Sequence, residues 1–244
     1  MDVLKDISVI CLDTETTGLD FSNDDIVEFS AVVPLEDDVK TIDFYLPTDR
    51  PITESARRKN RFTKASLLKK SKGRTRKQTL RDIMNLMKAS VNDTLFIAMN
   101  MPFDLTMIRN NLDRYIGKDD YEAFDTIADI MDNIKCFDVL VMDKILRPST
   151  NGGNRRLETL ADVYGTVTKP SHNSLDDAKC TLEIAIQQLQ SLAESKTIDI
   201  TDLDAVHEYM CERAVEQQES LNEFFKKVGH EPVDYIGFPY YETD

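Results

Sequence analysis

Cysteine is scarce in this chain, and its few cysteines are scattered. The 244 residues include four, and no two of them form a C-x-x-C pair: Cys11, Cys136, Cys180 and Cys211. This spacing excludes a zinc ribbon or a disulfide framework, and it favours reduced thiols within the core. The sequence also lacks internal repeats and low-complexity tracts.

Long apolar runs are absent as well. No continuous apolar stretch has membrane-spanning length, and residues 1–5 lack the charged and then apolar pattern of a signal segment. We therefore expect no membrane partner and a cytoplasmic location. With 41% hydrophobic residues, a chain of this length can bury a sizeable core in one large domain that carries an extension.

Positive charge is in the minority, and most of the chain is acidic. The formal net charge is −14, which by itself disfavours nucleic-acid binding. However, 12 of the 30 basic residues lie in one segment, residues 57–81, which contains no Asp or Glu. Such a basic segment can hold a phosphate backbone while the remaining surface repels it. The alternative is a solvated loop.

The hydrophobic pattern predicts a mixed α/β sheet. Alternating apolar residues predict strands over 8–12, 25–33 and 40–46, which would form an antiparallel meander. The rest is expected to contain loops at 47–73 and 147–154, strands at 95–98 and 134–139, and helices at 79–89, 102–112, 121–131, 157–164, 174–192 and 202–228. Strands that then alternate with helices indicate this fold class. We expect one domain over 1–195, followed by a helical extension with a short aromatic tail over 196–244.

Two carboxylates stand at the end of the first predicted strand. Asp13 and Glu15 are spaced i, i+2, so a strand would present both side chains on one face. Two neighbouring acids at the end of a buried strand are costly unless a cation lies between them, and hard divalent cations prefer carboxylate oxygens. The alternative is a strand that simply ends in a polar turn.

Further candidates follow later in the chain. Asp104 comes after the predicted strand 95–98 and opens a helix, which is a favoured place for ligands in α/β sheets. His172 precedes another helix, and Asp177 lies five residues later, inside the first turns. Taken singly, Asp104 could merely complete a helical turn, and an isolated histidine in this position is more often a loop or capping residue.

Taken in order, these segments resemble the DEDDh group of 3′→5′ exonucleases, which includes the proofreading subunit of bacterial replicative polymerases. The matching motifs are Asp13-Thr14-Glu15-Thr16-Thr17-Gly18-Leu19, Asn100-x-x-Phe103-Asp104 and His172-x4-Asp177. The segment 156–161 also resembles the family, and the similarity covers roughly residues 6–193. Met99 and Met101 depart from the pattern. The resemblance implies a ribonuclease H-like fold, with a mixed five-stranded sheet flanked by helices and a C-terminal helical extension.

The resemblance also implies a two-metal mechanism with Mg²⁺ or Mn²⁺. Asp13 would bridge both ions, Glu15 and Asp177 would complete one site, and Asp104 would serve the other. His172 would be the general base, a role that suits a side chain with a reference pKa of about 6.5. The expected substrate-binding residues are Thr16, Thr17, Gly18, Leu19, Asn100 and Phe103. We add Lys69, Lys70, Lys72 and Arg74 from the basic segment, as a track for the substrate backbone.

The implied reaction is hydrolysis of single-stranded or frayed DNA 3′ ends to 5′-mononucleotides, in proofreading or repair. Because the sequence contains no polymerase segment, proofreading would require a separate DNA polymerase as partner. One alternative is an exoribonuclease of the same family that trims short RNA, and the motifs do not separate the two. A second alternative is a non-catalytic structural subunit of a replication complex. The intact set of Asp13, Glu15, Asp104, His172 and Asp177 argues for catalysis.

Overall fold

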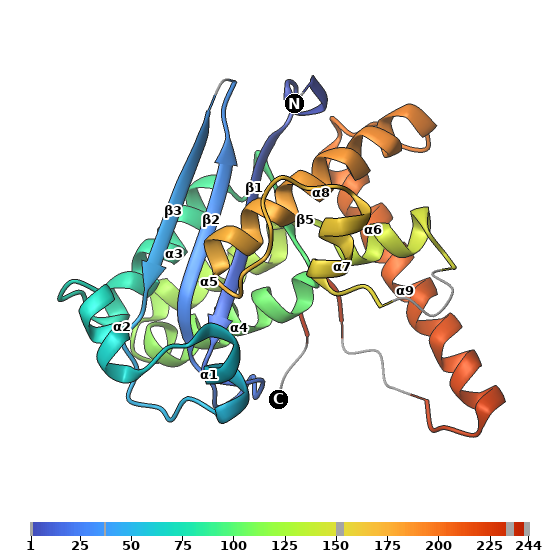
Figure 1. Ribbon diagram of the computed structural model, residues 1–244. Coiled ribbons are helices and arrows are strands. Elements are labelled where there is room, and N and C mark those ends of the chain that lie inside the picture. The colour runs from blue at the N-terminus through green and yellow to red at the C-terminus, as the bar shows by residue number, and fades with distance from the viewer. Residues whose placement is uncertain (1, 37, 150–153, 233–236, 242–244) are drawn as a thin grey trace.

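A mixed sheet of five strands lies at the centre of the structure, a computed structural model that describes residues 2–36, 38–149, 154–232 and 237–241 (Figure 1). The strands are β1 (Ser8–Thr16), β2 (Ile26–Pro34), β3 (Val39–Tyr45), β4 (Thr94–Ala98) and β5 (Lys135–Asp138), in the spatial order β3-β2-β1-β4-β5. The first three form an antiparallel meander, while β4 and β5 run parallel to β1. The predicted fold class and meander are confirmed.

Helices cover both faces of this sheet (Figure 1). They are α1 (Glu54–Asn60), α2 (Lys64–Lys70), α3 (Arg76–Ser90), α4 (Met101–Tyr115), α5 (Tyr121–Asn133), α6 (Val139–Leu146), α7 (Leu157–Val163), α8 (Ser174–Ser195) and α9 (Leu203–Val228). Short 3₁₀ turns lie at Asp2–Leu4 and Gly117–Asp119. All helices predicted from hydrophobic spacing are present, with ends shifted by a few residues.

Alternation along β1 directs its side chains into two separate cores. Ile10 and Leu12 pack into a cluster with residues of α3, α4 and α5 on one face of the sheet. Val9 and Cys11 point to the other face and pack with residues of α6, α8 and α9. The same period of two places the next odd-numbered residues, which include the two acids, on the α8 face.

The prediction of a loop over residues 47–73 is wrong, because this segment contains α1 and α2. Both helices have seven residues, too few for a periodic apolar pattern, and side-chain caps begin them. The Thr53 side chain accepts from the Ala56 backbone, while Thr63 and Ser66 form a reciprocal capping box. Leu67 anchors α2 in a small third core.

The C-terminal segment packs only partly on the rest of the chain. Val206 and Met210 in the first half of α9 are fully buried, whereas Leu221 and Phe224 in its second half are exposed. Figure 1 shows this second half projecting beyond the body of the molecule. The aromatic tail returns to the core, where the Tyr241 backbone donates to Thr106 Oγ1 at 2.8 Å. A domain boundary near residue 195 stays a prediction, and residues 150–153 of the expected loop 147–154 lie outside the described part.

All four cysteines are free, and three of them are fully buried, as a core of reduced thiols requires. Among the described residues, no helix has both the length and the apolar character needed to cross a membrane.

Candidate active site

Three of the four predicted acids come together beside the end of β1. Asp13 and Glu15 follow Val9 and Cys11 on the α8 face of the sheet, and Asp177 faces them from the first turn of α8. Each of the three offers a carboxylate oxygen, and these oxygens all lie within 4.8 Å of one another. Strand alternation and one helix therefore build a compact set of oxygen ligands from two distant parts of the sequence.

Asp104, the fourth predicted acid, lines the same cavity but comes from α4, which packs on the opposite face of the sheet from α8. It occupies the first turn of α4 and is 3% exposed. Its Oδ1 accepts from the Thr14 backbone at 3.0 Å and from the Thr14 hydroxyl at 2.7 Å. Thr14, which lies between the two acids in the sequence of β1, thus holds the Asp104 carboxylate.

Burial raises the pKa of every acid in this group, and repulsion from other members of the group adds to the shift at Asp13 and Glu15. Burial is the main cause for Asp13, whose pKa lies well above its ordinary value, with Asp104 and Asp177 adding to the shift. Burial also raises the pKa of Glu15 to about 8, against a hydrogen bond from Asn60 that lowers it. The pKa of Asp104 rises to about 7 through burial, although the bonds from Thr14 oppose the rise. Burial raises the pKa of Asp177 too. Such a cluster gains from a bound cation.

His172 faces the same cavity from the segment that precedes α8. Its backbone is in the left-handed region, with φ of 56°, and its ring is about half exposed. The ring Nε2 lies 3.6 Å from Glu158 Oε1 on α7. One residue earlier, the Ser171 backbone donates to Asp177 Oδ1 at 2.9 Å, so this turn also holds the acid.

The cavity has a volume of about 440 Å³ and collects most of the predicted residues. It is lined by all five predicted catalytic residues and by Thr16, Gly18, Leu19 and Phe103. Sequence reasoning did not assign five further lining residues: Thr14, Thr53, Ser55, Ala56 and Met99. Lys59 also lines it, and this one member of the basic segment reaches the cavity because α1 folds over the end of β1.

Other predicted substrate-binding residues lie elsewhere. Thr17 is buried, and its hydroxyl donates to Asp24 Oδ1 at 2.6 Å. Asn100 lines a neighbouring cavity of about 690 Å³. Lys69, Lys70, Lys72 and Arg74 do not line the 440 Å³ cavity. The Lys70 ammonium lies 4.0 Å over the Tyr45 ring, and Arg74 pairs with Asp82.

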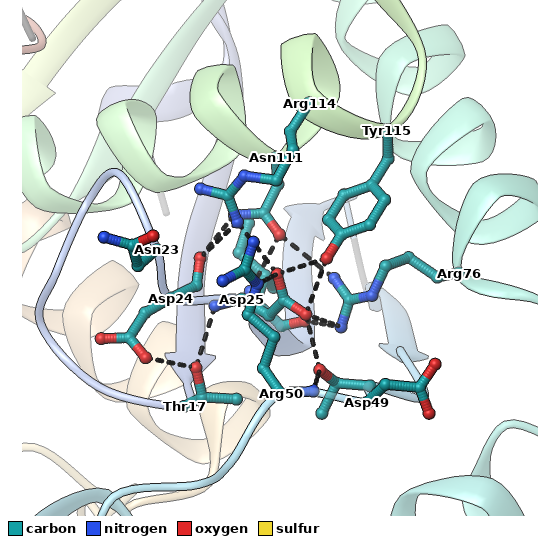
Figure 2. A network of polar contacts seen from close by, with 12 residues as sticks. Thr17, Asn23, Asp24, Asp25, Asp49, Arg50, Arg76, Asn111, Arg114 and Tyr115 are labelled. Carbon is teal, nitrogen blue, oxygen red and sulfur yellow. Dashed lines mark hydrogen bonds and ion pairs between the residues drawn. The ribbon is translucent and has the colours of Figure 1, made fainter. Parts of the chain in front are cut away.

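A buried ion-pair network holds the connection between β1 and β2 (Figure 2). Its centre is Asp25, which is fully buried, and whose Oδ1 lies 3.1 Å from Arg114 Nη1. Arg76 lies 3.5 Å and Arg50 3.6 Å from the same carboxylate, and the Tyr115 hydroxyl donates to it at 2.8 Å. The network ties α3 and α4 to the loop beside the cavity, and nothing in the sequence pattern singled out these partners.

Gly18 is required by the same connection. A Cβ atom at this position would lie 2.3 Å from Asp24 Oδ2, so any side chain here would force the Asp24 carboxylate to move. Asp24 is in turn held by the Thr17 hydroxyl and by the Asp20 backbone. The close approach of these two segments leaves Leu19 at the rim of the cavity, 75% exposed.

A family model named RNase T and described as exonuclease matches residues 10–185. The chain belongs to this exonuclease family. The match covers the strands, the four acids and the histidine, and it confirms the resemblance found in the sequence motifs. The family places the chain among the nucleic-acid hydrolases.

Curated relatives with similar sequences are DNA polymerases of the PolC type. The Staphylococcus aureus DNA polymerase III PolC-type is 25% identical over 247 positions, which cover 96% of this chain and 16% of that protein. The Thermotoga maritima DNA polymerase III PolC-type is 22% identical, and the match covers 95% of this chain and 16% of that protein. This exonuclease chain therefore spans about one sixth of the length of these relatives.

Solved structures share the fold at low sequence identity. Escherichia coli exonuclease I in complex with a dA16 oligonucleotide has a TM-score of 0.61 and 20% identity, covering 78% of this chain and 42% of that one. Exonuclease X in complex with 5′-overhanging duplex DNA has a TM-score of 0.51 and 20% identity, covering 75% and 92%. The predicted ribonuclease H-like exonuclease fold is confirmed.

Proposed function

We propose that the chain is a metal-dependent 3′→5′ exonuclease that releases 5′-mononucleotides from single-stranded or frayed DNA 3′ ends. The observation that carries this proposal is the convergence of Asp13, Glu15 and Asp177 within 4.8 Å, in a cavity that also holds Asp104 and His172. A set of oxygen ligands with raised pKa values suits hard divalent cations such as Mg²⁺ or Mn²⁺.

The residues present fit two such ions. Asp13, Glu15 and Asp177 would hold one ion, and Asp104 together with Asp13 would hold the second. When bound, the ions supply Lewis-acid activation of water and of the phosphoryl oxygen. The high pKa values of these carboxyl groups without metal imply that ion binding displaces protons from them.

His172 would take the proton of the attacking water. The water oxygen forms a bond to the terminal phosphorus, and the bond from this phosphorus to the preceding 3′ oxygen breaks. The water proton passes to the imidazole, and solvent provides the proton of the new 3′-hydroxyl. Glu158 Oε1, 3.6 Å from Nε2, would orient the ring. Half exposure lets the ring return its proton to solvent.

The cavity walls suit the last nucleotide of an unpaired strand. Leu19 and Phe103 offer apolar surface for a base, and Lys59 offers a cation for a phosphate. We keep Lys69, Lys70, Lys72 and Arg74 as a proposed track for the more distant backbone, since they lie on α2 and the turn that follows it, next to α1. Replacing all four by Ala should flatten the salt dependence of DNA binding, and an unchanged slope would exclude this track.

DNA is favoured as substrate because exonuclease I and exonuclease X are described in complex with DNA. The PolC relatives carry the matching segment within chains about six times as long, which supports a proposed role beside a DNA polymerase. We propose a DNA polymerase as partner, and residues 196–244 as an extension to the 1–195 exonuclease domain.

The test uses 5′-labelled DNA and RNA strands of equal sequence, incubated with Mg²⁺, Mn²⁺ or EDTA. A ladder that shortens from the 3′ end, and that EDTA abolishes, is expected on DNA. Asp177→Asn should remove it, whereas Asp176→Asn should not, because only Asp177 lines the cavity. Faster digestion of RNA would identify an exoribonuclease. If neither the DNA strand nor the RNA strand is shortened with Mg²⁺ or Mn²⁺, the result would favour a non-catalytic subunit.

A further inference from the structure

Glu28 is a fifth carboxylate beside the site, and neither the motifs nor the cavity include it. It is the third residue of β2 and is fully buried. In the antiparallel ladder Glu28 stands directly opposite Glu15, and Ser30 stands directly opposite Asp13. Directly opposed residues project from the same face of a sheet, so both side chains lie on the α8 face together with the two acids.

Glu28 and Ser30 contact the start of α8. The Ser174 backbone donates to Glu28 Oε2 at 3.1 Å, and the Asn173 side chain donates to Glu28 Oε1 at 3.0 Å. The Ser30 and Ser174 hydroxyls are 2.7 Å apart. The cross-strand partners of the two β1 acids are thus the residues that hold the first turn of the helix carrying Asp177.

This arrangement is more than an ordinary helix cap. The Asn173 side chain already caps α8, because its Oδ1 accepts from the Asp176 backbone. One Glu28 oxygen accepts from the first residue of α8 and the other from its N-cap side chain, and the Tyr45 hydroxyl also bonds to this carboxylate. Glu28 is not among the three residues whose ligand atoms cluster. A buried carboxylate at the N-terminus of a 22-residue helix is stabilised by the helix dipole, which makes the contact specific in position.

We propose that Glu28 is a positioning residue, which sets Asp177 and His172 at their working distance from Asp13 and Glu15 by binding the first residues of α8. The proposal rests on the proposed exonuclease function. In this arrangement β1 carries Asp13 and Glu15, and the paired strand β2 carries the residue that holds α8 opposite them. Outer residues that orient metal ligands commonly control metal affinity 10- to 100-fold, and an error near 1 Å in placement can cost about 100-fold in rate.

The experiment compares Glu28→Ala, Glu28→Gln and the control Asp143→Ala. Asp143 is also a fully buried carboxylate, and it accepts from Arg155 and Tyr164, none of which lines the cavity. Tyr164 accepts from α8 at Gln187 and Gln188, so the loss of Asp143 destabilises the fold but leaves the contacts at the first turn of α8 in place. Mn²⁺ binding by calorimetry and kcat and KM on single-stranded DNA are measured for each variant that keeps the wild-type circular dichroism.

We expect Glu28→Ala to weaken Mn²⁺ binding about 10-fold and to lower kcat about 100-fold with little change in KM. Glu28→Gln should fall between Ala and wild type, since its carbonyl can still accept from the Ser174 backbone. The Asp143→Ala control should keep both Mn²⁺ affinity and kcat. Mn²⁺ affinity that is the same in Glu28→Ala and wild type would overturn the proposal, as would a Gln variant equal to Ala.

The Mn²⁺ measurement also separates this proposal from the exonuclease function. Loss of affinity in Glu28→Ala supports the positioning role even if wild type digests no strand, a result that would reject only the nuclease. Conversely, an active wild type with an unaffected Glu28→Ala variant rejects only the positioning role.

Discussion

Metal binding should release protons from the acid cluster, and the number follows from the structure. The pKa of Glu15 is raised to about 8 and that of Asp104 to about 7 in the metal-free chain. At pH 7 these values leave about 0.9 proton on Glu15 and about 0.5 on Asp104. Two bound divalent cations, one beside Glu15 and one beside Asp104, require both carboxylates ionised, so the two groups together should release about 1.4 protons when both sites fill. Asp13, whose pKa is also raised, adds to this number.

The assay is calorimetric titration of Mn²⁺ at pH 7 in Pipes and in Tris, whose different ionisation enthalpies report the protons released. Release should fall as pH rises through 8, because Glu15 and Asp104 are then already ionised. Asp104→Asn should reduce the release by about 0.5 proton at pH 7. Mn²⁺ binding at pH 7 without proton release would refute the account of a repulsive, buried cluster.

The same shifts make the metal-free chain less stable at high pH. The pKa of Glu15 rises from an ordinary 4.5 to about 8 on folding, so between these values the folded chain holds more protons than the unfolded chain. Its unfolding free energy therefore falls by up to about 1.4 kcal/mol per pH unit from this group, from pH 4.5 towards 8. Mg²⁺ should remove much of this loss, which urea unfolding with Mg²⁺ and with EDTA measures.

Three further predictions concern the cavity wall and its support. Gly18→Ala should lower the free energy of unfolding by about 1–3 kcal/mol, because its methyl group clashes with Asp24. The double variant with Gly18→Ala and Asp24→Ala should lose less than the sum of the two single losses, as measured by urea unfolding. Asp25→Ala should cost about 3–5 kcal/mol, since it leaves buried arginines unpaired, and a loss below about 1 kcal/mol would contradict the network. Lys59→Ala should reduce the salt dependence of DNA binding by the equivalent of about one phosphate contact. The control Lys227→Ala, at an exposed basic residue outside the segment, should leave this dependence unchanged.

The acids of the site could be predicted because each depends on local geometry. Asp13 and Glu15 share a face through strand alternation, and Asp177 follows a helix start that the sequence marks clearly. The ordered motifs then joined segments that local patterns leave apart, and they favoured a catalytic role for Asp104 and His172, whose local positions alone also allowed structural roles. The cavity confirms that these side chains meet.

The walls of the cavity could not be predicted, because they depend on long-range contacts. Lys59 reaches the site only through α1, a helix too short for a periodic signal. Lys70, chosen from charge alone, instead lies over the Tyr45 ring. Period-two alternation assigns Glu28 to a face of β2, but it does not show that α8 covers this face and buries the carboxylate.

The register between β1 and β2 connects both halves of the site. A shift of one residue would turn both Glu28 and Ser30 away from α8, because successive side chains alternate between faces. The regular pairing ends between Glu15 and Thr16, where the ladder becomes irregular. Irregularities of this kind re-aim the chain beside active sites. Here Thr16 turns to donate to Gly18 O at 2.6 Å, and Leu19 reaches the cavity rim. The regular ladder thus carries the acids, and its interruption directs the residues proposed to contact the nucleotide.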